Sequence, residues 1–273
     1  MKKEVKIITK DSTLNLTDLD NFIYLDFVEN DVQITTNTTE VKGIDGVLTG
    51  ASTFAPFELE LNFVYSGVDI HDYHLFKSKL RELIYRRDPY YVWHSDMPGK
   101  KYAVLPNSTE IEDIYGRNGR IKVKFNVFKG YSESLYKTDQ FSLMSDKWQF
   151  GNGLIPDESI SYKHTRQKFK IFNGSSDTIN PRFHFLKIWI RANTDKSFKI
   201  VNKTTGDVFE FKGTLKKNQS LVLDGVYPYL DLKRCGRITN HGVISLAPGF
   251  NDFEVWGSLS NFEIEFVFNY IYR

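Results

Sequence analysis

The sequence predicts a mainly β protein with one α-helix, and two observations carry that prediction. Aromatic residues make up 15% of the 273 residues, with 22 Phe and 15 Tyr, and aromatic side chains are enriched in strands. Short segments of alternating apolar and polar residues recur along the chain, whereas a single segment has the spacing of an amphipathic helix. The same composition argues against a helical bundle, a coiled coil and a globally disordered chain, because charged residues are 26% and hydrophobic residues 41% of the total.

In the first half, alternation predicts strands around the helix. Residues 57–65 alternate apolar and polar side chains, residues 120–128 repeat that pattern, and a shorter strand is expected at 101–105. The Asp45-Gly46 pair supplies the positive φ angles of a tight hairpin turn. One buried and one wet face is therefore expected for this sheet.

The predicted helix covers residues 69–87. Asp69 can cap its first turn, and Pro89 prevents its continuation. The apolar stripe consists of Tyr73, Phe76, Leu80, Leu83 and Ile84. Such a stripe predicts one helix packed on a sheet.

Residues 138–273 are predicted to form a second domain, an antiparallel sandwich whose strands recur about every ten residues. The boundary is placed near residue 137, inside an irregular stretch from 132 to 161 that contains Gly151-Asn152-Gly153 and Pro156. A change of phase between Phe183 and Leu186 suggests a β-bulge or a strand buried on both faces. The expected strands cover residues 169–172, 183–190, 198–201, 208–211, 221–223, 243–246 and 262–272.

Charge is distributed unevenly along the chain. Residues 1–60 carry a net charge of −6, residues 61–137 of +4, and residues 138–273 of +4. One interpretation is ordinary scatter over solvated faces. The other is that acidic and basic patches on one module allow copies to associate through two different complementary surfaces.

The motifs offer no catalytic constellation, and we predict no enzyme, no metal and no cofactor. The single cysteine, Cys235, excludes an intrachain disulfide; its three basic neighbours could activate the thiol, but an incidental cysteine is the simpler interpretation. His71 and His74 lie three residues apart on the helix and could share a metal, although two ligands make an incomplete site. Glu58 and Glu60 would suit glycoside hydrolysis only if they faced one cleft.

Two further features are weak candidates for binding sites, one for a cation and one for a sugar. The acidic residues of one early stretch could hold a hard cation, but a solvated acidic face explains them better. These residues are Asp18, Asp20, Asp26, Glu29 and Asp31. The segment Asn180-Pro181-Arg182-Phe183 resembles part of the galectin sugar-binding motif, yet Thr178 stands in place of its histidine, and Leu259 and Asn261 in place of the residues that should follow Trp256. We therefore expect a strand entry there and no glycan binding.

No recognisable signal peptide opens the chain, and no apolar run is long enough to cross a bilayer. The net charge of +2 is too balanced for a typical nucleic-acid-binding domain. We therefore expect a protein that is made in a cytoplasm without membrane insertion, and that either stays soluble or leaves by a route that the chain does not encode.

The order of the parts resembles the distal tail proteins (Dit) of the siphophage tail-component family. In the first half the resemblance rests on Gly43-Ile44-Asp45-Gly46, the strand at 57–65 and the helix that ends before Asp88-Pro89. In the second half it rests on three turn segments. They are Asn202-Lys203-Thr204-Thr205-Gly206-Asp207, Ser220-Leu221-Val222-Leu223-Asp224-Gly225 and Leu246-Ala247-Pro248-Gly249-Phe250-Asn251.

This resemblance implies a structural virion protein at the phage tail tip, made in the host bacterial cytoplasm. Residues 1–137 would be a β-sandwich-like domain that forms a hexameric ring, and residues 138–273 a galectin-like β-sandwich that is not a lectin. The implied partners are the tail tube protein, the tail-associated lysin or fibre hub and a receptor-binding protein, with DNA crossing the lumen without specific binding. The alternatives are a carbohydrate-binding module, a β-rich enzyme, or another virion component such as a tube protein or baseplate adaptor.

Overall fold

The structure is a computed structural model, and it describes residues 2–145, 147–151, 154 and 157–273. These residues divide into two compact units, Met1–Glu133 with Arg273, and Ser134–Tyr272. The boundary expected near residue 137 lies a few residues after this division. Asn152, Gly153 and Pro156, which contributed to the predicted irregular stretch, lie outside the described residues.

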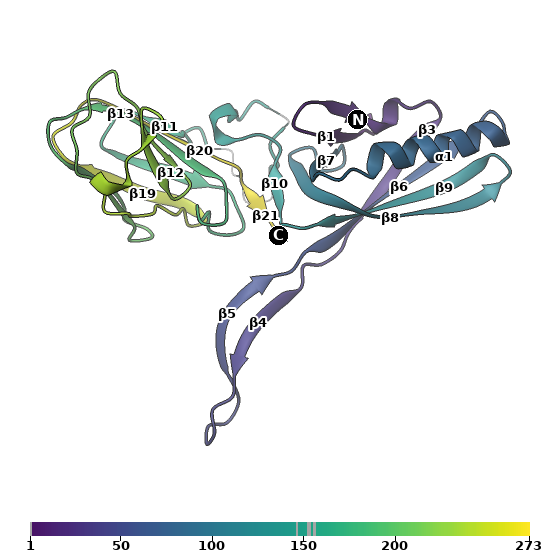
Figure 1. Cartoon of the computed structure of the whole chain (residues 1–273), viewed down its shortest axis with the longest axis horizontal. Helices are drawn as coiled ribbons and strands as arrows, with labels where there is room; N and C mark the ends of the chain where they lie inside the picture. Colours follow the sequence, from purple (N-terminus) through teal and green to yellow (C-terminus); the bar gives the residue numbers. More distant parts are fainter. Residues whose placement is uncertain (1, 146, 152–153, 155–156) are drawn as a thin grey trace. The chain divides into compact units, whose positions relative to one another are not determined.

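The first unit is built on one antiparallel sheet with the strand order β2-β1-β7-β8-β9-β6-β3 (Figure 1). A short 3-10 turn, η1 (Leu16–Asp18), joins β2 to β3. The strands are β1 (Val5–Ile8), β2 (Thr13–Asn15), β3 (Phe22–Glu29), β6 (Phe57–Ser66), β7 (Tyr90–His94), β8 (Lys100–Tyr115) and β9 (Asn118–Val127). Buried side chains from strands near both ends of this order, such as β1 and β3, belong to one hydrophobic core together with those of the helix. One sheet and one helix therefore enclose the interior of this unit.

The pairing of β6 with β9 confirms the predicted alternation. The two strands stay in register from Phe57 opposite Val127 to Ser66 opposite Asn118. Every second residue of β6 and of β9 is buried, and the residues between them are less buried or exposed. The apolar face therefore lies inside and the polar face outside, as a period of two requires.

Helix α1 (Ile70–Ile84) is the only α-helix among the described residues, so the prediction of a mainly β protein with one helix is confirmed. Asp69 accepts a hydrogen bond from the backbone N–H of Asp72 at 2.8 Å, which caps the first turn. Phe76 stacks on Tyr65 of β6 with ring centroids 3.6 Å apart. The predicted end at residue 87 is wrong by three residues, because the Tyr90 hydroxyl donates to the carbonyl of Ile84 at 2.7 Å and the helix ends there.

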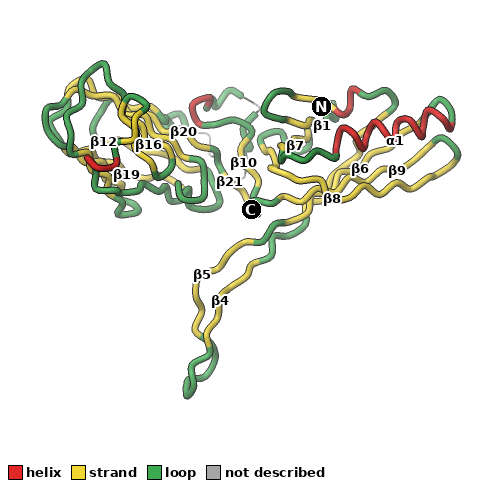
Figure 2. Tube along the Cα trace, in the orientation of Figure 1, coloured by secondary structure: helices red, strands yellow, loops and turns green. Residues whose placement is uncertain are grey.

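Strands β4 (Ile34–Thr39) and β5 (Leu48–Phe54) form a hairpin that pairs only with itself, and we call it the arm. Every residue of both strands is exposed, and Figure 2 shows the two strands running together up to the connecting loop. The tight turn expected at Asp45-Gly46 is instead a longer loop over residues 40–47. Gly43 and Gly46 both have positive φ angles in that loop, of 88° and 84°, which suits glycine.

Strand β8 is much longer than the predicted segment 101–105. Its second half is polar and lacks a clear alternation, so its own pattern does not indicate a strand. It is held as a strand by β9, and the register shifts between Pro106 and Ser108 because proline cannot donate a ladder hydrogen bond.

The second unit is a two-sheet sandwich, which confirms the prediction for this half. One sheet has the order β11-β20-β13-β16-β17-β18 and the other β12-β19-β14-β15. Phe253 of β19 and Phe266 of β20 meet between the sheets with ring centroids 5.0 Å apart. The strands of the two sheets are β11 (Lys163–His164), β12 (Lys168–Asn173), β13 (Leu186–Asn193), β14 (Phe198–Asn202), β15 (Val208–Phe211), β16 (Leu221–Asp224), β17 (Tyr227–Leu230), β18 (Lys233–Arg234), β19 (Gly249–Trp256) and β20 (Ser260–Phe268). Strand β21 (Ile271–Tyr272) belongs to neither sheet.

Three strand predictions in this unit are corrected. Residues 182–185 form a turn, with the backbone N–H of Phe183 bonded to the carbonyl of Asn180, so the change of phase marks the start of β13. The bulge in β13 lies between Arg191 and Asn193 instead. Residues 243–246 make only an isolated bridge through Leu246, because its partner Ile179 lies in no strand. The last predicted strand is interrupted after Phe268 and resumes at β21.

The turn before β19 explains the pattern Leu-Ala-Pro-Gly-Phe-Asn at 246–251. Asn251 is fully buried, and its side-chain oxygen accepts from the backbone N–H of Ala247 at 2.9 Å and from the amide of Asn202 at 3.1 Å. Its side-chain nitrogen donates to the carbonyls of Ala247 and Gly249. Gly249 has a φ angle of 84°, which disfavours a residue with a side chain. One amide therefore holds both sides of the turn.

Replacing that amide should be costly. Asn251→Asp keeps the shape but turns a donor into an acceptor that faces two carbonyl oxygens, so we expect a loss of about 3 kcal/mol in the free energy of unfolding. Urea unfolding with hydrogen exchange of β19 measures the change. Asn218→Asp, at an exposed position, makes the same charge change and should stay within about 0.5 kcal/mol of wild type. Equal losses in the two variants would contradict this account.

Candidate functional site

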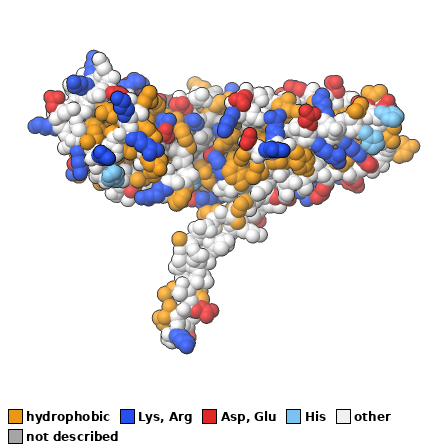
Figure 3. All heavy atoms as spheres, in the orientation of Figure 1, with side chains coloured by type: hydrophobic (Ala, Val, Ile, Leu, Met, Phe, Trp, Pro, Cys, Tyr) orange, Lys and Arg blue, Asp and Glu red, His pale blue; other side chains and the backbone are white. Residues whose placement is uncertain are grey.

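The arm is the most exposed part of the first unit. A two-stranded hairpin alone is marginally stable in water, and this one exposes large apolar side chains, which Figure 3 shows gathered along it. They are Ile34 (62% exposed), Ile44 (61%), Leu48 (58%), Val47 (48%), Val41 (38%) and Phe54 (38%). Exposed apolar clusters of this kind mark surfaces that bind another molecule. The arm is thus a candidate assembly surface.

The polar face of strands β3, β6, β9 and β8 carries a balanced ladder of charges. Lys124 lies 2.7 Å from Glu110 and 3.8 Å from Glu60, and Lys122 lies 3.9 Å from Glu60. Glu58 accepts a hydrogen bond from the Asn107 side chain at 2.9 Å. Glu58 and Glu60 are therefore each engaged with neighbours across the sheet, and they do not form an opposed acid pair of the kind that glycoside hydrolysis needs.

A third surface, the helix-end patch, lies where α1 begins and β8 turns into β9. Two contacts tie these segments together: the backbone N–H of Gly67 donates to the carbonyl of Arg117, and the Tyr73 hydroxyl donates to Asp113 at 2.6 Å. The patch consists of Tyr115 (84% exposed), Val68 (71%), Leu75 (70%), Ile114 (60%) and Ile70 (52%). Five large apolar side chains uncovered at one end of a unit form a second candidate binding surface.

The predicted metal candidates stay apart. In the part of the chain that the structure describes, no three His, Cys, Asp or Glu side chains lie close enough together to hold a metal ion. Three members of the early acidic stretch each have their own hydrogen-bond donor: Asn15 for Asp18, Asn62 for Asp26 and Tyr102 for Glu29. The carboxylates are thus spread over the sheet and do not converge on a cation.

The half-buried Cys235 has a thiol pKa above its ordinary value because of burial. A raised pKa keeps the thiol protonated at neutral pH, whereas a reactive cysteine needs a lowered one. The basic neighbours therefore do not activate it.

The galectin-like fragment does not assemble a sugar site. Residues Asn180 to Phe183 lead into β13 of the six-stranded sheet, whereas Trp256 ends β19 of the other sheet. Glu254, two residues before Trp256, is paired with Lys168 at 2.9 Å. The two halves of the motif are thus on different sheets, so stacking face and hydrogen-bonding groups do not converge.

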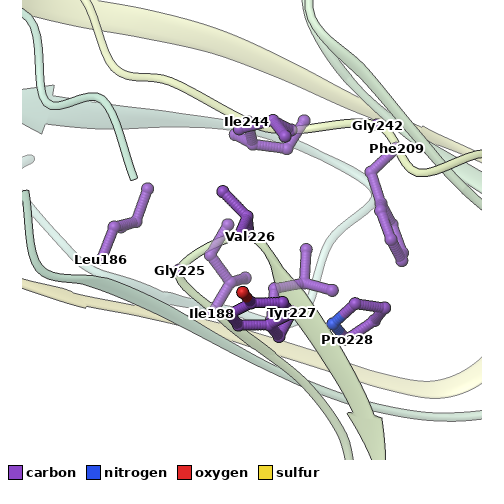
Figure 4. Close-up of a pocket in the computed structure, with 11 residues that line it drawn as sticks. Leu186, Ile188, Phe209, Gly225, Val226, Tyr227, Pro228, Gly242 and Ile244 are labelled. Atoms are coloured by element: carbon purple, nitrogen blue, oxygen red, sulfur yellow. The ribbon is translucent and has the colours of Figure 1, made fainter. Parts of the chain in front are cut away.

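A hollow between the sheets of the second unit is too small for a substrate. It is lined by apolar side chains such as Leu186, Ile188 and Phe209, which Figure 4 shows pointing toward a common space with Val226 and Ile244. Its volume is about 10 Å³, which is the room needed by about one water molecule.

One buried titratable group was missed by the sequence reasoning. His94 is fully buried at the end of β7, with its Nδ1 3.4 Å from the Tyr24 hydroxyl and its ring stacked on Tyr102. Burial lowers the pKa of His94 to about 4, although Asp96 nearby opposes the shift. The alternation of Tyr90, Val92 and His94 along β7 was the available signal, since all three share the inward face. This histidine is a neutral member of the core.

His94 should make the first unit sensitive to acid. In the unfolded chain the imidazole has a pKa near 6.5. Between about pH 6.5 and pH 4 this histidine is therefore protonated in the unfolded chain and neutral in the folded chain. The free energy of unfolding should therefore fall as the pH falls through this range, by up to about 3 kcal/mol from this group. The nearby charges Asp96, Lys100 and Lys3 act on the same group.

The variant His94→Phe tests this, because it keeps a ring of similar size and removes the titration. Hydrogen exchange of β7 and β8, measured from pH 7 to pH 4, should show a smaller loss of stability than in wild type. His71→Gln, at an exposed histidine, should leave the wild-type slope unchanged. A His94→Phe protein with the wild-type slope would refute the assignment.

Among the described residues, no helix is long and apolar enough to cross a membrane.

In a comparison with protein families, residues 10–127 of the first unit match the phage tail protein RIFT-related domain. No curated protein sequence matches the chain.

Among solved structures, the chain is similar to the Dit protein (gp 19.1) of phage SPP1, described as a paradigm of the hub adsorption apparatus in phages that infect Gram-positive bacteria. The TM-score is 0.72 at 12% identity, with 100% of both chains covered. The phage P2 baseplate in its activated conformation with Ca matches at a TM-score of 0.44 and 12% identity, over 99% of this chain and 98% of that one. The resemblance to siphophage tail components is confirmed, and the fold of the whole chain is that of the SPP1 protein.

Proposed function

We propose that this protein is a structural hub of a phage tail tip, located in the virion, that joins the tail tube to the tail-associated lysin or fibre hub. The observation that carries the proposal is that the fold follows a phage hub protein over its entire length, while the first unit matches a phage tail family. The carboxylates of Glu58 and Glu60, which are engaged with neighbours across the sheet, support a structural and non-enzymatic role.

Copies of the first unit would close a hexameric ring through the arm. The strands of the arm pair only with each other, and its apolar side chains are exposed, although the Arg273 guanidinium lies over the Phe54 ring at 3.7 Å. Seated on a neighbouring copy, it would bury those side chains at each junction of the ring. The uneven charge fits the same contact, because residues 1–60 carry −6 and residues 61–137 carry +4, and a head-to-tail ring joins two different surfaces.

The polar face of β3, β6, β9 and β8 would line the lumen through which DNA passes. Its lysines are neutralised by glutamates on neighbouring strands. Proteins hold DNA mainly by neutralising its phosphates with free cations. A face whose lysines are already paired would therefore hold DNA less tightly than a face of free lysines.

The helix-end patch would serve a neighbour stacked along the tail axis. It lies at the end of the long strands β8 and β9, so in a ring whose lumen these strands line, the patch is presented toward the next ring. The second unit would present its loops to peripheral partners such as a receptor-binding protein.

Ring formation can be tested on the full chain. We expect native mass spectrometry to show a hexamer and negative-stain microscopy a ring with an open centre. The triple variant Val41→Asp, Ile44→Asp and Val47→Asp places charges on the apolar arm and should leave only folded monomers. Phe183→Asp, at another exposed aromatic position in the second unit (77% exposed), should still form rings. A monomeric wild-type protein at high concentration would contradict the proposal.

The alternative function is a carbohydrate-binding module, for which the exposed Trp256 is the one supporting feature (52% exposed). Because its sugar motif is split between two sheets, we expect no glycan binding. A glycan array with the full-length protein is the measurement. Reproducible binding that Trp256→Ala abolishes and Phe183→Ala leaves intact would favour the carbohydrate-binding module instead.

A further inference from the structure

A basic hollow lies at the edge of the six-stranded sheet of the second unit. It is formed by the β17–β18 hairpin, by the short 3-10 turn η3 (Gly236–Ile238) and by His241. The hollow has a volume of about 800 Å³, which is the size range of small-molecule sites. Leu230 and Ile238 contribute apolar surface, and Lys233, Arg234, Arg237 and His241 contribute basic groups.

The cations of this hollow are not neutralised. Fifteen ion pairs occur elsewhere among the described residues, yet none of them includes Lys233, Arg234 or Arg237. The one acidic residue that lines the hollow, Asp231, accepts hydrogen bonds from the backbone N–H of Ser220 and the side chain of Gln219, both at 2.9 Å. Its carboxylate therefore fixes the hairpin. With three cations and one carboxylate, the residues that line the hollow carry a net charge of +2 when His241 is neutral.

Arg234 is held in place before any ligand arrives. Its guanidinium lies over the ring of Tyr227, 4.4 Å from the centroid, and Arg234 stands opposite Tyr229 in the pairing of β17 with β18. A guanidinium fixed by stacking presents its remaining N–H groups as a fork that suits oxyanions, and it loses little side-chain entropy on binding.

Two backbone positions of the hollow belong to the tight turn of the hairpin. Asp231 and Leu232 are the two residues between β17 and β18, and their φ angles of 47° and 68° are those that a two-residue hairpin turn requires. His241 has a φ angle of 56°. The turn places Lys233 and Arg234 directly after it in the chain.

We propose that this hollow binds a phosphate group. Three cations and a histidine around one concavity suit an anion with several acceptor oxygens and more than a single point of contact. A partner peptide added to the sheet edge fits less well, because β18 is only the two residues Lys233 and Arg234, and strand addition relies on a longer run of main-chain bonds. The phosphate could be free or carried on a phosphodiester-linked chain.

The test measures binding of a fluorescent glycerol-phosphate oligomer to the full-length protein, with orthophosphate as competitor. The double variant Arg234→Gln, Arg237→Gln should bind the oligomer at least tenfold more weakly. Arg234→Lys keeps the charge and loses the guanidinium fork, so its affinity for the oligomer should lie between those of the wild type and the double variant. The matched control Lys168→Gln, Lys170→Gln removes the same charge from the other sheet of this unit and should stay within about twofold of wild type.

The competitor separates the two sources of phosphate. Displacement by millimolar orthophosphate shows that the group itself is recognised; an oligomer that binds without being displaced shows a chain-carried phosphate, and either result supports the site. No binding of oligomer or orthophosphate would overturn the proposal. So would equal weakening by the control variant, or binding of an oligo-aspartate peptide as tight as that of the phosphate oligomer. Hydrogen exchange of β17 in each variant verifies that the hairpin stays folded.

Discussion

The long, in-register pairing of β6 with β9 is the constraint on which the first unit depends. It places one apolar face under α1, where Phe76 stacks on Tyr65, and it leaves the other face polar because side chains alternate along each strand. A slip of one residue would exchange the two faces. One register therefore determines the buried core, the apolar face on which α1 packs, and the charged face that carries Glu60, Lys122 and Lys124.

The first unit leaves several surfaces uncovered. The arm and the helix-end patch expose large apolar side chains, and the polar face of the sheet carries paired charges. Exposed apolar clusters of this kind mark surfaces that contact other molecules.

Prediction from the sequence succeeded where the local spacing of apolar residues indicates which side chains are buried. The strands around residues 57–65 and 120–128 and the start of the helix at Asp69 were identified because alternation, apolar stripe and cap are local signals. The second half of β8 was missed because its polar residues are held by β9. The buried His94 was missed because Tyr91 and Trp93 on the other face of the strand are also aromatic, so the inward alternation of Tyr90, Val92 and His94 did not stand out.

The sequence by itself determined the mainly β class, the single helix, the two-part organisation and the resemblance to phage tail components, since each depends on local periodicity and on turn residues in a fixed order. Only the tertiary structure decided which surfaces remain open. It showed that the residues on either side of Asp45-Gly46 form an arm whose strands pair only with each other, and that the cations near Cys235 surround one hollow. Exposure and convergence depend on which strands become neighbours, and long-range pairing is not encoded in any single stretch of chain.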